Sequence, residues 1–296
     1  MAAATATFEG RGRASELVEL GQAILQSIEG KVGIAIIVVF AAFAVLGSHL
    51  APYGALVIGA GNPNDGPSLA HWLGTDDLGR DVLSRLIVGT SSVVVTPLIA
   101  TLGAFVMGGL IGLLTGYLGG VFDQAVARVI DIGLSLPPLL VVLVVTAAFG
   151  TDAQVIVLAV ALVYAPRVAR VIRGATQGIS TKEYVLAAQA RGERSLPIVL
   201  REILPNIAPT VFVEFAVRLV YVILFITTLN FLGLGLHPPA PNWGLMVAES
   251  RAELTTNPVA ALAPTVAIGA LAIAIGLVAD AVTQTFGIDR PDRLLR

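Results

Sequence analysis

The sequence predicts an all-α membrane protein with six transmembrane helices. Of its 296 residues, 56% are hydrophobic and only 13% are charged, and the mean hydropathy is +0.86. About a quarter of the residues in an ordinary soluble domain are charged. Six apolar runs approach the roughly 20 residues that cross a bilayer core as a helix. Transmembrane strands would give shorter segments of alternating polarity, and the sequence lacks that pattern.

The six predicted helices follow one another with short turns or polar loops between them. They span residues 32–50, 93–115, 129–149, 153–172, 207–229 and 260–282. The fourth run is the weakest, because Pro166, Arg167 and Arg170 shorten its apolar part. Prolines in such helices permit kinks, although packing alone explains any single one equally well. The candidate kinks are at Pro97, Pro137, Pro138 and Pro264.

Lysine and arginine are concentrated on one side of this predicted bundle, with seven of them between Arg167 and Arg201. Cytoplasmic loops of membrane proteins are enriched in these residues. We therefore expect both termini in the cytoplasm. The first 22 residues lack the basic, apolar and small-residue order of a cleaved signal peptide, so we expect none. The resulting segments are a cytoplasmic segment 1–31, a first helix 32–50, an external loop 51–92, a helical core 93–283 that contains the cytoplasmic loop 173–206 and the external loop 233–258, and a cytoplasmic tail 284–296.

The densest group of charges precedes the fifth predicted helix and is expected to form two short helices. Ser180 or Thr181 is suited to cap the first helix, and Gly192 is suited to end it. The second helix is expected over residues 195–204, with Pro205 as its end.

Two small residues, Ala187 and Ala188, would let another surface approach the first of these helices closely. The charges by themselves are equally consistent with a basic loop that fixes the topology and contacts anionic lipid.

The spacing of Ala187, Ala188 and Gly192, followed by Pro205 in "ILPN", resembles the EAA loop in the transmembrane subunits of type I ABC importers. In that family the loop docks into a groove on the ATP-binding subunit and transmits its closure. Leu186 departs from the motif, which has glutamate there. The resemblance implies a coupling role for Glu183, Tyr184, Ala187, Ala188, Arg191, Gly192, Leu204 and Pro205.

Two further segments resemble the C-type permease of dipeptide and oligopeptide importers, a family that also includes nickel transporters. They are "HWLGTDDLGRDVLSRLIVG" at 71–89 and "LNFLGLGLHPPAPNWGLMVAESRAEL" at 229–254. The resemblance implies a type I ABC transmembrane domain in the cytoplasmic membrane. It also implies partners: two ATP-binding subunits that hold ATP and magnesium, a homologous B-type permease, and an external peptide-binding protein. Nickel or another small solute remains an alternative substrate.

Four charged residues and a tryptophan in the external segments are candidates for contact with the binding protein or for a gate. They are Asp76, Asp77, Arg80, Asp81 and Trp243. The four charges are equally suited to a turn that pairs its own charges and caps the following helix.

Ionisable residues inside the predicted membrane helices are few, and such residues are costly enough to be functional candidates. They are Asp131, Glu214, Arg218 and Asp280, all expected nearer the cytoplasmic ends. Glu214 and Arg218 are four residues apart, so we expect them to pair on one helix face.

Catalytic functions have little support in the sequence. There is no cysteine, and His49, His71 and His237 share no metal-ligand spacing. No GxxxxGK[ST] motif is present for nucleotide binding. Ser135 and Asp131 lie one turn apart, but no intramembrane histidine completes a nucleophilic site. We therefore expect a non-catalytic permease with no cofactor of its own, the alternatives being a stand-alone secondary transporter or channel and a membrane enzyme.

Overall fold

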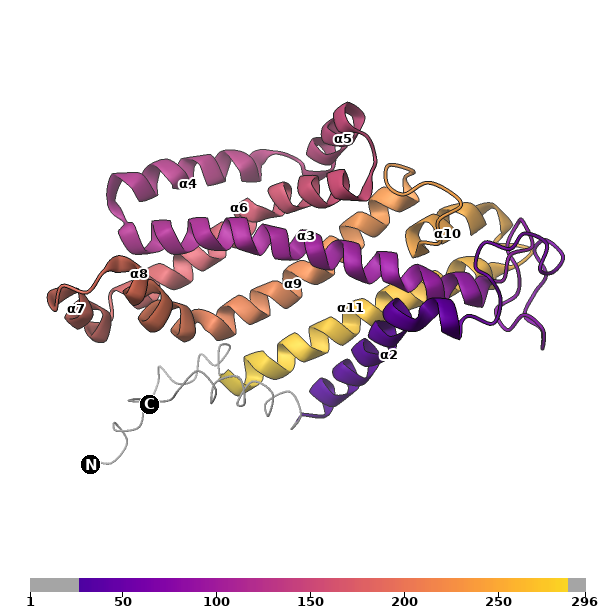
Figure 1. The fold of residues 1–296 in the computed structure, drawn as a ribbon, viewed down its shortest axis with the longest axis horizontal. Coiled ribbons are helices and arrows are strands. Elements are labelled where there is room, and N and C mark those ends of the chain that lie inside the picture. The colour runs from indigo at the N-terminus through magenta and orange to yellow at the C-terminus, as the bar shows by residue number, and fades with distance from the viewer. Residues whose placement is uncertain (1–26, 287–296) are drawn as a thin grey trace.

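The computed structural model describes residues 27–286, in which every regular element is a helix and no strand is present. The predicted segment 1–31 lies almost wholly outside this part of the chain, as does most of the tail 284–296. The helices, drawn in Figure 1, are α2 (Ile28–Leu50), α3 (Val82–Leu118), α4 (Gly120–Ser135), α5 (Pro138–Phe149), α6 (Ala153–Ser180), α7 (Glu183–Ala190), α8 (Ser195–Ile198), α9 (Leu204–Phe231), α10 (Trp243–Ser250) and α11 (Pro258–Phe286), with a π-helical turn at Val199–Ile203 and a 3-10 turn at Arg251–Glu253.

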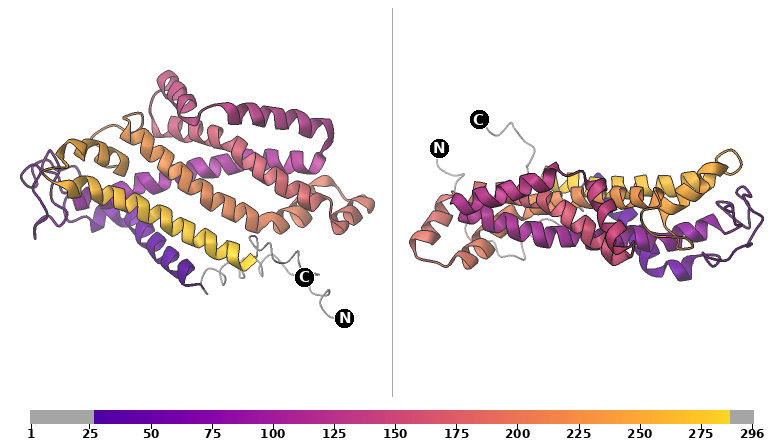
Figure 2. Two further views of the ribbon diagram at one scale, coloured as in Figure 1. Left: turned by 180° about the vertical axis from the view of Figure 1, so that it is seen from behind. Right: turned by 90° about the horizontal axis from the view of Figure 1, so that it is seen from above.

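The long helices lie side by side in a bundle that is broad in one view and thin in the view from above (Figures 1 and 2). The short helices α7 and α8 form one end of the long axis (Figure 1). The loop before α3 and the helix α10 form the other end. The two segments that the sequence marks as functional are therefore separated by the full length of the bundle.

Five helices are long and apolar enough to cross a membrane, and α4 with α5 makes a sixth span if the pair is counted as one. The predicted helical membrane fold is confirmed, but the third predicted helix is not continuous. The chain bends by 83° between α4 and α5. Leu136 and Pro137 are extended at this break, because a proline disfavours helical backbone in the residue before it.

Two helix boundaries differ from the sequence prediction in a way that matters for the sites. α3 begins at Val82 rather than at residue 93, so the outer loop is shorter than predicted. α6 continues to Ser180 instead of ending near residue 172. Hydropathy marks only the apolar part of a helix, and both helices extend beyond it with polar residues.

A row of glycines brings α3 against α6. Gly108, Gly112 and Gly116 are buried and four residues apart, so they lie on one face of α3. A Cβ atom at Gly112 would lie only 2.7 Å from the carbonyl oxygen of Ala169, and one at Gly116 only 2.7 Å from that of Arg173. Such rows of small residues allow membrane helices to pack backbone to backbone.

The buried apolar residues form two cores. One core joins α3, α6 and α9 and reaches the short helices, where it includes Val185, Ala188 and Ile198. The other joins α2, α3, α9, α10 and α11 and includes Trp243. The short helices α7 and α8 at one end of the bundle, and α10 at the other end, are therefore each packed against one of these cores.

Candidate functional site

The α7–α8 segment, residues 181–203, contains most of the predicted coupling residues. α7 begins at Glu183, and Lys182 occupies the N-cap position without a side-chain hydrogen bond. The predicted cap by Ser180 or Thr181 is therefore wrong. Ser180 is the last residue of α6 and Thr181 is its C-cap, and the Ser180 hydroxyl donates to the carbonyl oxygen of Gln177.

Gly192 ends α7, as predicted, and it does so through its backbone conformation. Its φ is +76°, in the left-handed region that favours glycine. The Gly192 N–H donates to the carbonyl of Gln189 and the Glu193 N–H to that of Ala188, the two bonds of a Schellman motif. A Cβ at residue 192 would meet no atom within 4 Å. The chain itself therefore leaves open space around this turn.

The predicted coupling residues divide between the two sides of α7. Glu183, Tyr184 and Ala187 are exposed, as are Arg191 and Gly192 beyond the helix.

The side chain of Ala188 is fully buried in the core, so its small size serves packing within this chain. The prediction that Ala188 is open to a partner is therefore wrong. Leu186 and Leu196 were not among the predicted contacts, yet they are 50% and 67% exposed. Burial raises the pKa of Tyr184, and the Glu202 carboxylate raises it further.

Pro205 does not end a helix, contrary to the prediction. It is the second residue of α9, which directly follows the π-helical turn Val199–Ile203. The π-helical turn connects α8 directly to α9, so residues Ser195–Phe231 form one helical stretch of 37 residues. Ile198 and Ile203 anchor the base of this stretch with fully buried side chains. Displacement of the α7–α8 segment would therefore act directly on a membrane helix.

At the other end of the bundle, Asp76, Arg80, Arg85 and Glu249 form a buried network of ion pairs. Asp76 Oδ2 lies 2.6 Å from Arg80 Nε and 2.5 Å from Arg85 Nη1. Glu249 Oε2 lies 3.1 Å from Arg80 Nη2 and 2.8 Å from Arg85 Nη2. Two positive and two negative charges therefore balance. They tie the outer loop to the start of α3 and to α10, and the contact with Glu249 spans 169 residues of sequence.

Asp81 caps α3, which is the structural alternative that the sequence offered. Its Oδ2 accepts hydrogen bonds from the Ser84 N–H at 2.8 Å and the Ser84 hydroxyl at 2.7 Å. Its other carboxylate oxygen lies 2.8 Å from Nδ1 of His71.

The outward-facing role predicted for most of the external residues disagrees with their burial. Asp76, Arg80 and Asp81 are at most 2% exposed. Trp243 is fully buried, and its Nε1–H donates to the carbonyl of Leu86 at 2.8 Å. Asp77, with a side chain 43% exposed, is the member of the predicted set that faces outward.

The charges within the membrane helices are mostly paired. Arg218 Nε lies 2.5 Å from Glu214 Oε1, which confirms the predicted pair. Asp131 pairs with Arg170 on α6. Asp280 makes no ion pair within residues 27–286 and is exposed. Arg218 has 14 residues of α9 before it and 13 after it. The Glu214–Arg218 pair therefore lies in the middle of α9 and not, as was predicted, near a cytoplasmic end.

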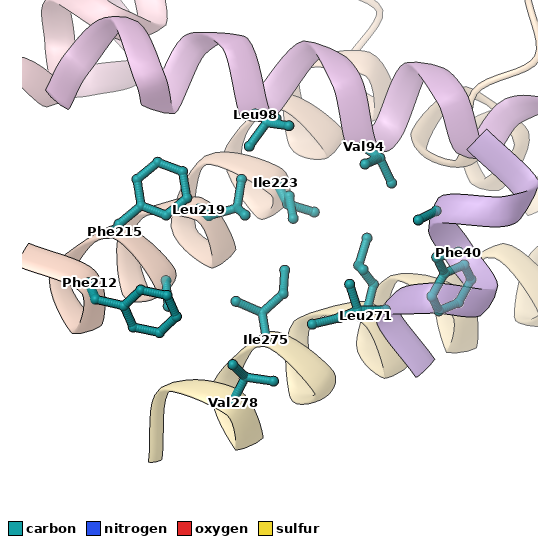
Figure 3. Close-up of a pocket in the computed structure, with 13 residues that line it drawn as sticks. Phe40, Val94, Leu98, Phe212, Phe215, Leu219, Ile223, Leu271, Ile275 and Val278 are labelled. Carbon is teal, nitrogen blue, oxygen red and sulfur yellow. The ribbon is translucent and has the colours of Figure 1, made fainter. Parts of the chain in front are cut away.

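An apolar cavity of about 340 Å³ opens between α2, α3, α9 and α11. Phe212, Phe215, Leu219 and Ile223 of α9 point into it, facing Leu271 and Ile275 of α11 (Figure 3). Within residues 27–286, the side chains that line it are all apolar. The Glu214–Arg218 pair is on the same helix but not among the lining residues, so α9 has an apolar side and a charged side.

Comparison with known proteins identifies relatives over most of the chain. A family model described as "Binding-protein-dependent transport system inner membrane component" matches residues 108–287. The glutathione transport system permease protein GsiD of Pectobacterium atrosepticum is 36% identical over 217 residues, 73% of this chain and 72% of that protein. The dipeptide transport system permease protein DppC of Alkalihalophilus pseudofirmus is 31% identical over 249 residues, 84% of this chain and 82% of that protein.

The fold is also found in a solved structure. A chain of the inward-facing MetNI methionine ABC transporter superposes with a TM-score of 0.57 at 17% identity, covering 70% of this chain and 97% of that chain. At this level of identity the likeness shows the fold alone.

Proposed function

The chain belongs to the family of binding-protein-dependent transport system inner membrane components, the permeases of ABC importers, and we propose that its importer takes up short peptides. The observation that carries this proposal is the match to permeases named for glutathione and dipeptide transport over more than 70% of each chain. Glutathione is itself a short peptide, so both names point to one class of solute. This chain would form half of the membrane pathway.

We propose that the α7–α8 segment docks on an ATP-binding subunit and passes its movement to α9. Two features support this mechanism. The segment presents Glu183, Tyr184 and Ala187 to solvent on one side, while Val185 and Ala188 fix its other side to the bundle core. α8, which follows α7 after the turn at Gly192, is continuous with α9 and so connects the segment to a membrane helix.

The partners follow from this mechanism. The chain would require two ATP-binding subunits, which hold ATP and magnesium, and a homologous second permease. An external binding protein would deliver the peptide. Both termini and the α7–α8 segment would lie in the cytoplasm, since the basic residues of the chain concentrate at that end. No chemical step is assigned to this chain.

Copurification followed by transport measurement tests the proposal. The tagged chain is isolated from its own host, and the complex is reconstituted in vesicles with its binding protein. We expect ATP-binding subunits in the complex and ATP-dependent uptake of labelled dialanine. Uptake of ⁶³Ni²⁺ in place of dialanine would overturn the peptide assignment. Uptake by this chain alone, without ATP, would overturn the importer mechanism.

A further inference from the structure

Arg167 and Arg218 occupy the middle of two long helices that touch each other. Each arginine has 14 residues of its helix before it and 13 after it, in α6 (Ala153–Ser180) and α9 (Leu204–Phe231) respectively. At 1.5 Å per residue, about 20 Å of helix separates each from either helix end. Charged side chains in membrane helices usually face a partner or a water-filled path.

Tyrosine rings accompany both arginines. The Cζ atom of Arg167 lies 5.4 Å from the ring centroid of Tyr164, and that of Arg218 lies 5.8 Å from the ring centroid of Tyr221. The ring of Tyr164 on α6 packs against that of Phe225 on α9, with 5.8 Å between the centroids, and Phe225 lies one helical turn after Tyr221. The two arginine–tyrosine pairs therefore lie at the contact between α6 and α9, where they form one cluster.

Positive charge exceeds negative charge in this cluster. Glu214 accepts a hydrogen bond from Arg218, whereas Arg167 donates only to a carbonyl oxygen one turn earlier in α6, at 2.9 Å. Among residues 27–286, no carboxylate forms an ion pair with Arg167, and neither tyrosine hydroxyl has a hydrogen-bond partner. Tyr221 is 55% exposed, so the cluster can be reached from outside the chain. The cluster thus offers several donors and one net positive charge.

We infer that Arg167, Arg218, Tyr164 and Tyr221 bind the carboxylate group of the solute as it crosses the membrane. The inference rests on the proposed function, since a short peptide carries a free carboxylate at its C-terminus. Guanidinium groups bind carboxylates through paired hydrogen bonds, and tyrosine hydroxyls add further donors. Glu214 orients Arg218 and limits the net charge to one. A transport site must bind its solute weakly enough to release it, and a net charge of only one favours release.

The test compares peptides that differ only in their carboxylate. Vesicles containing the complete importer are supplied with an equimolar mixture of dialanine and trialanine, each as the free acid and as the C-terminal amide. Mass spectrometry of the vesicle contents gives the ratio of acid to amide taken up. Comparison with wild type cancels any preference of the binding protein, because that protein is the same in every sample.

We expect Arg167→Gln and Arg218→Gln to lower the acid-to-amide ratio by about tenfold each, as loss of a charge-assisted hydrogen bond predicts. Arg218→Lys keeps the charge but loses the planar fork, so its ratio should fall between wild type and Arg218→Gln. Arg170→Gln is the matched control: Arg170 lies on the same helix as Arg167, is 57% exposed and pairs with Asp131. Its ratio should equal that of wild type.

Two results would overturn the inference while leaving the proposed function intact. One is an unchanged ratio in the Arg167 and Arg218 variants. The other is an equal loss of acid and amide uptake together with a lower yield of assembled complex, which would assign these arginines to a contact with the second permease. A wild-type importer that takes up none of the four peptides would instead refute the peptide assignment, and the inference with it.

Discussion

Removing the negative charge of Asp76 should destabilise the outer end of the bundle more than removing that of the adjacent Asp77. Asp76→Asn keeps the shape of the side chain and an oxygen for the N–H groups of Leu78 and Arg80, which lie 3.0 and 2.9 Å away. It leaves Arg80 and Arg85, which are 2% and 1% exposed, with the partly exposed Glu249 as the carboxylate they still share. Breaking a buried ion pair by removing one partner costs about 3–5 kcal/mol.

The matched control is Asp77→Asn. Asp77 lies 3.5 Å from Arg80, but its side chain is 43% exposed, so water already solvates this pair. Exposed pairs contribute about 0–1 kcal/mol. The two variants carry the same substitution at adjacent positions, one at a buried carboxylate with two arginine partners and one at an exposed carboxylate with a single, longer contact.

Tryptophan fluorescence provides the assay, because Trp243 is fully buried near this network and Trp72 is 70% exposed. In a Trp72→Phe background the signal reports on Trp243 alone. We expect Asp76→Asn to lower the melting temperature on the order of 10 °C and Asp77→Asn by about 2 °C or less. If the two variants melt together, burial of Asp76 does not govern the stability of this end, and the reasoning fails.

Three further outcomes are expected. Gly192→Val should reduce the coupling of ATP hydrolysis to transport in the reconstituted importer more than Gly192→Asn does, because asparagine tolerates a positive φ; equal effects would count against the backbone explanation. Gly112→Leu should prevent α3 from packing on α6 and abolish folded protein in size-exclusion chromatography, whereas Gly174→Leu, where nothing lies within 4 Å, should be tolerated; a well-folded Gly112→Leu protein would contradict the packing argument. The pKa of Tyr184 is raised in the folded chain, so the neutral phenol stabilises the fold below about pH 10, the usual tyrosine value, and this contribution is lost as pH rises through the raised pKa. In Tyr184→Phe, the free energy of unfolding should therefore fall less steeply above pH 10 than in wild type. An unchanged pH profile would refute this.

Local chemistry was enough to predict several features. Runs of about 20 apolar residues predict membrane helices because a helix satisfies its own backbone hydrogen bonds in hydrocarbon. The turn at Gly192 and the pair Glu214–Arg218 are also local, since each depends on residues within one or two helical turns. The spacing of the loop around Gly192 sufficed to indicate the permease family, which the relatives confirm.

Contacts between distant segments decided the rest. The sequence gives no sign that Arg85 and Glu249 share a network with Asp76, or that Trp243 is buried against α3, because these contacts join segments more than 150 residues apart. Burial of Ala188 likewise depends on a core built by other helices. The sequence determined which segments enter the membrane and which family the chain belongs to, since both follow from local hydropathy and spacing. Only the tertiary structure decided which charges are buried in ion pairs and which stay open, because burial depends on neighbours that the fold supplies.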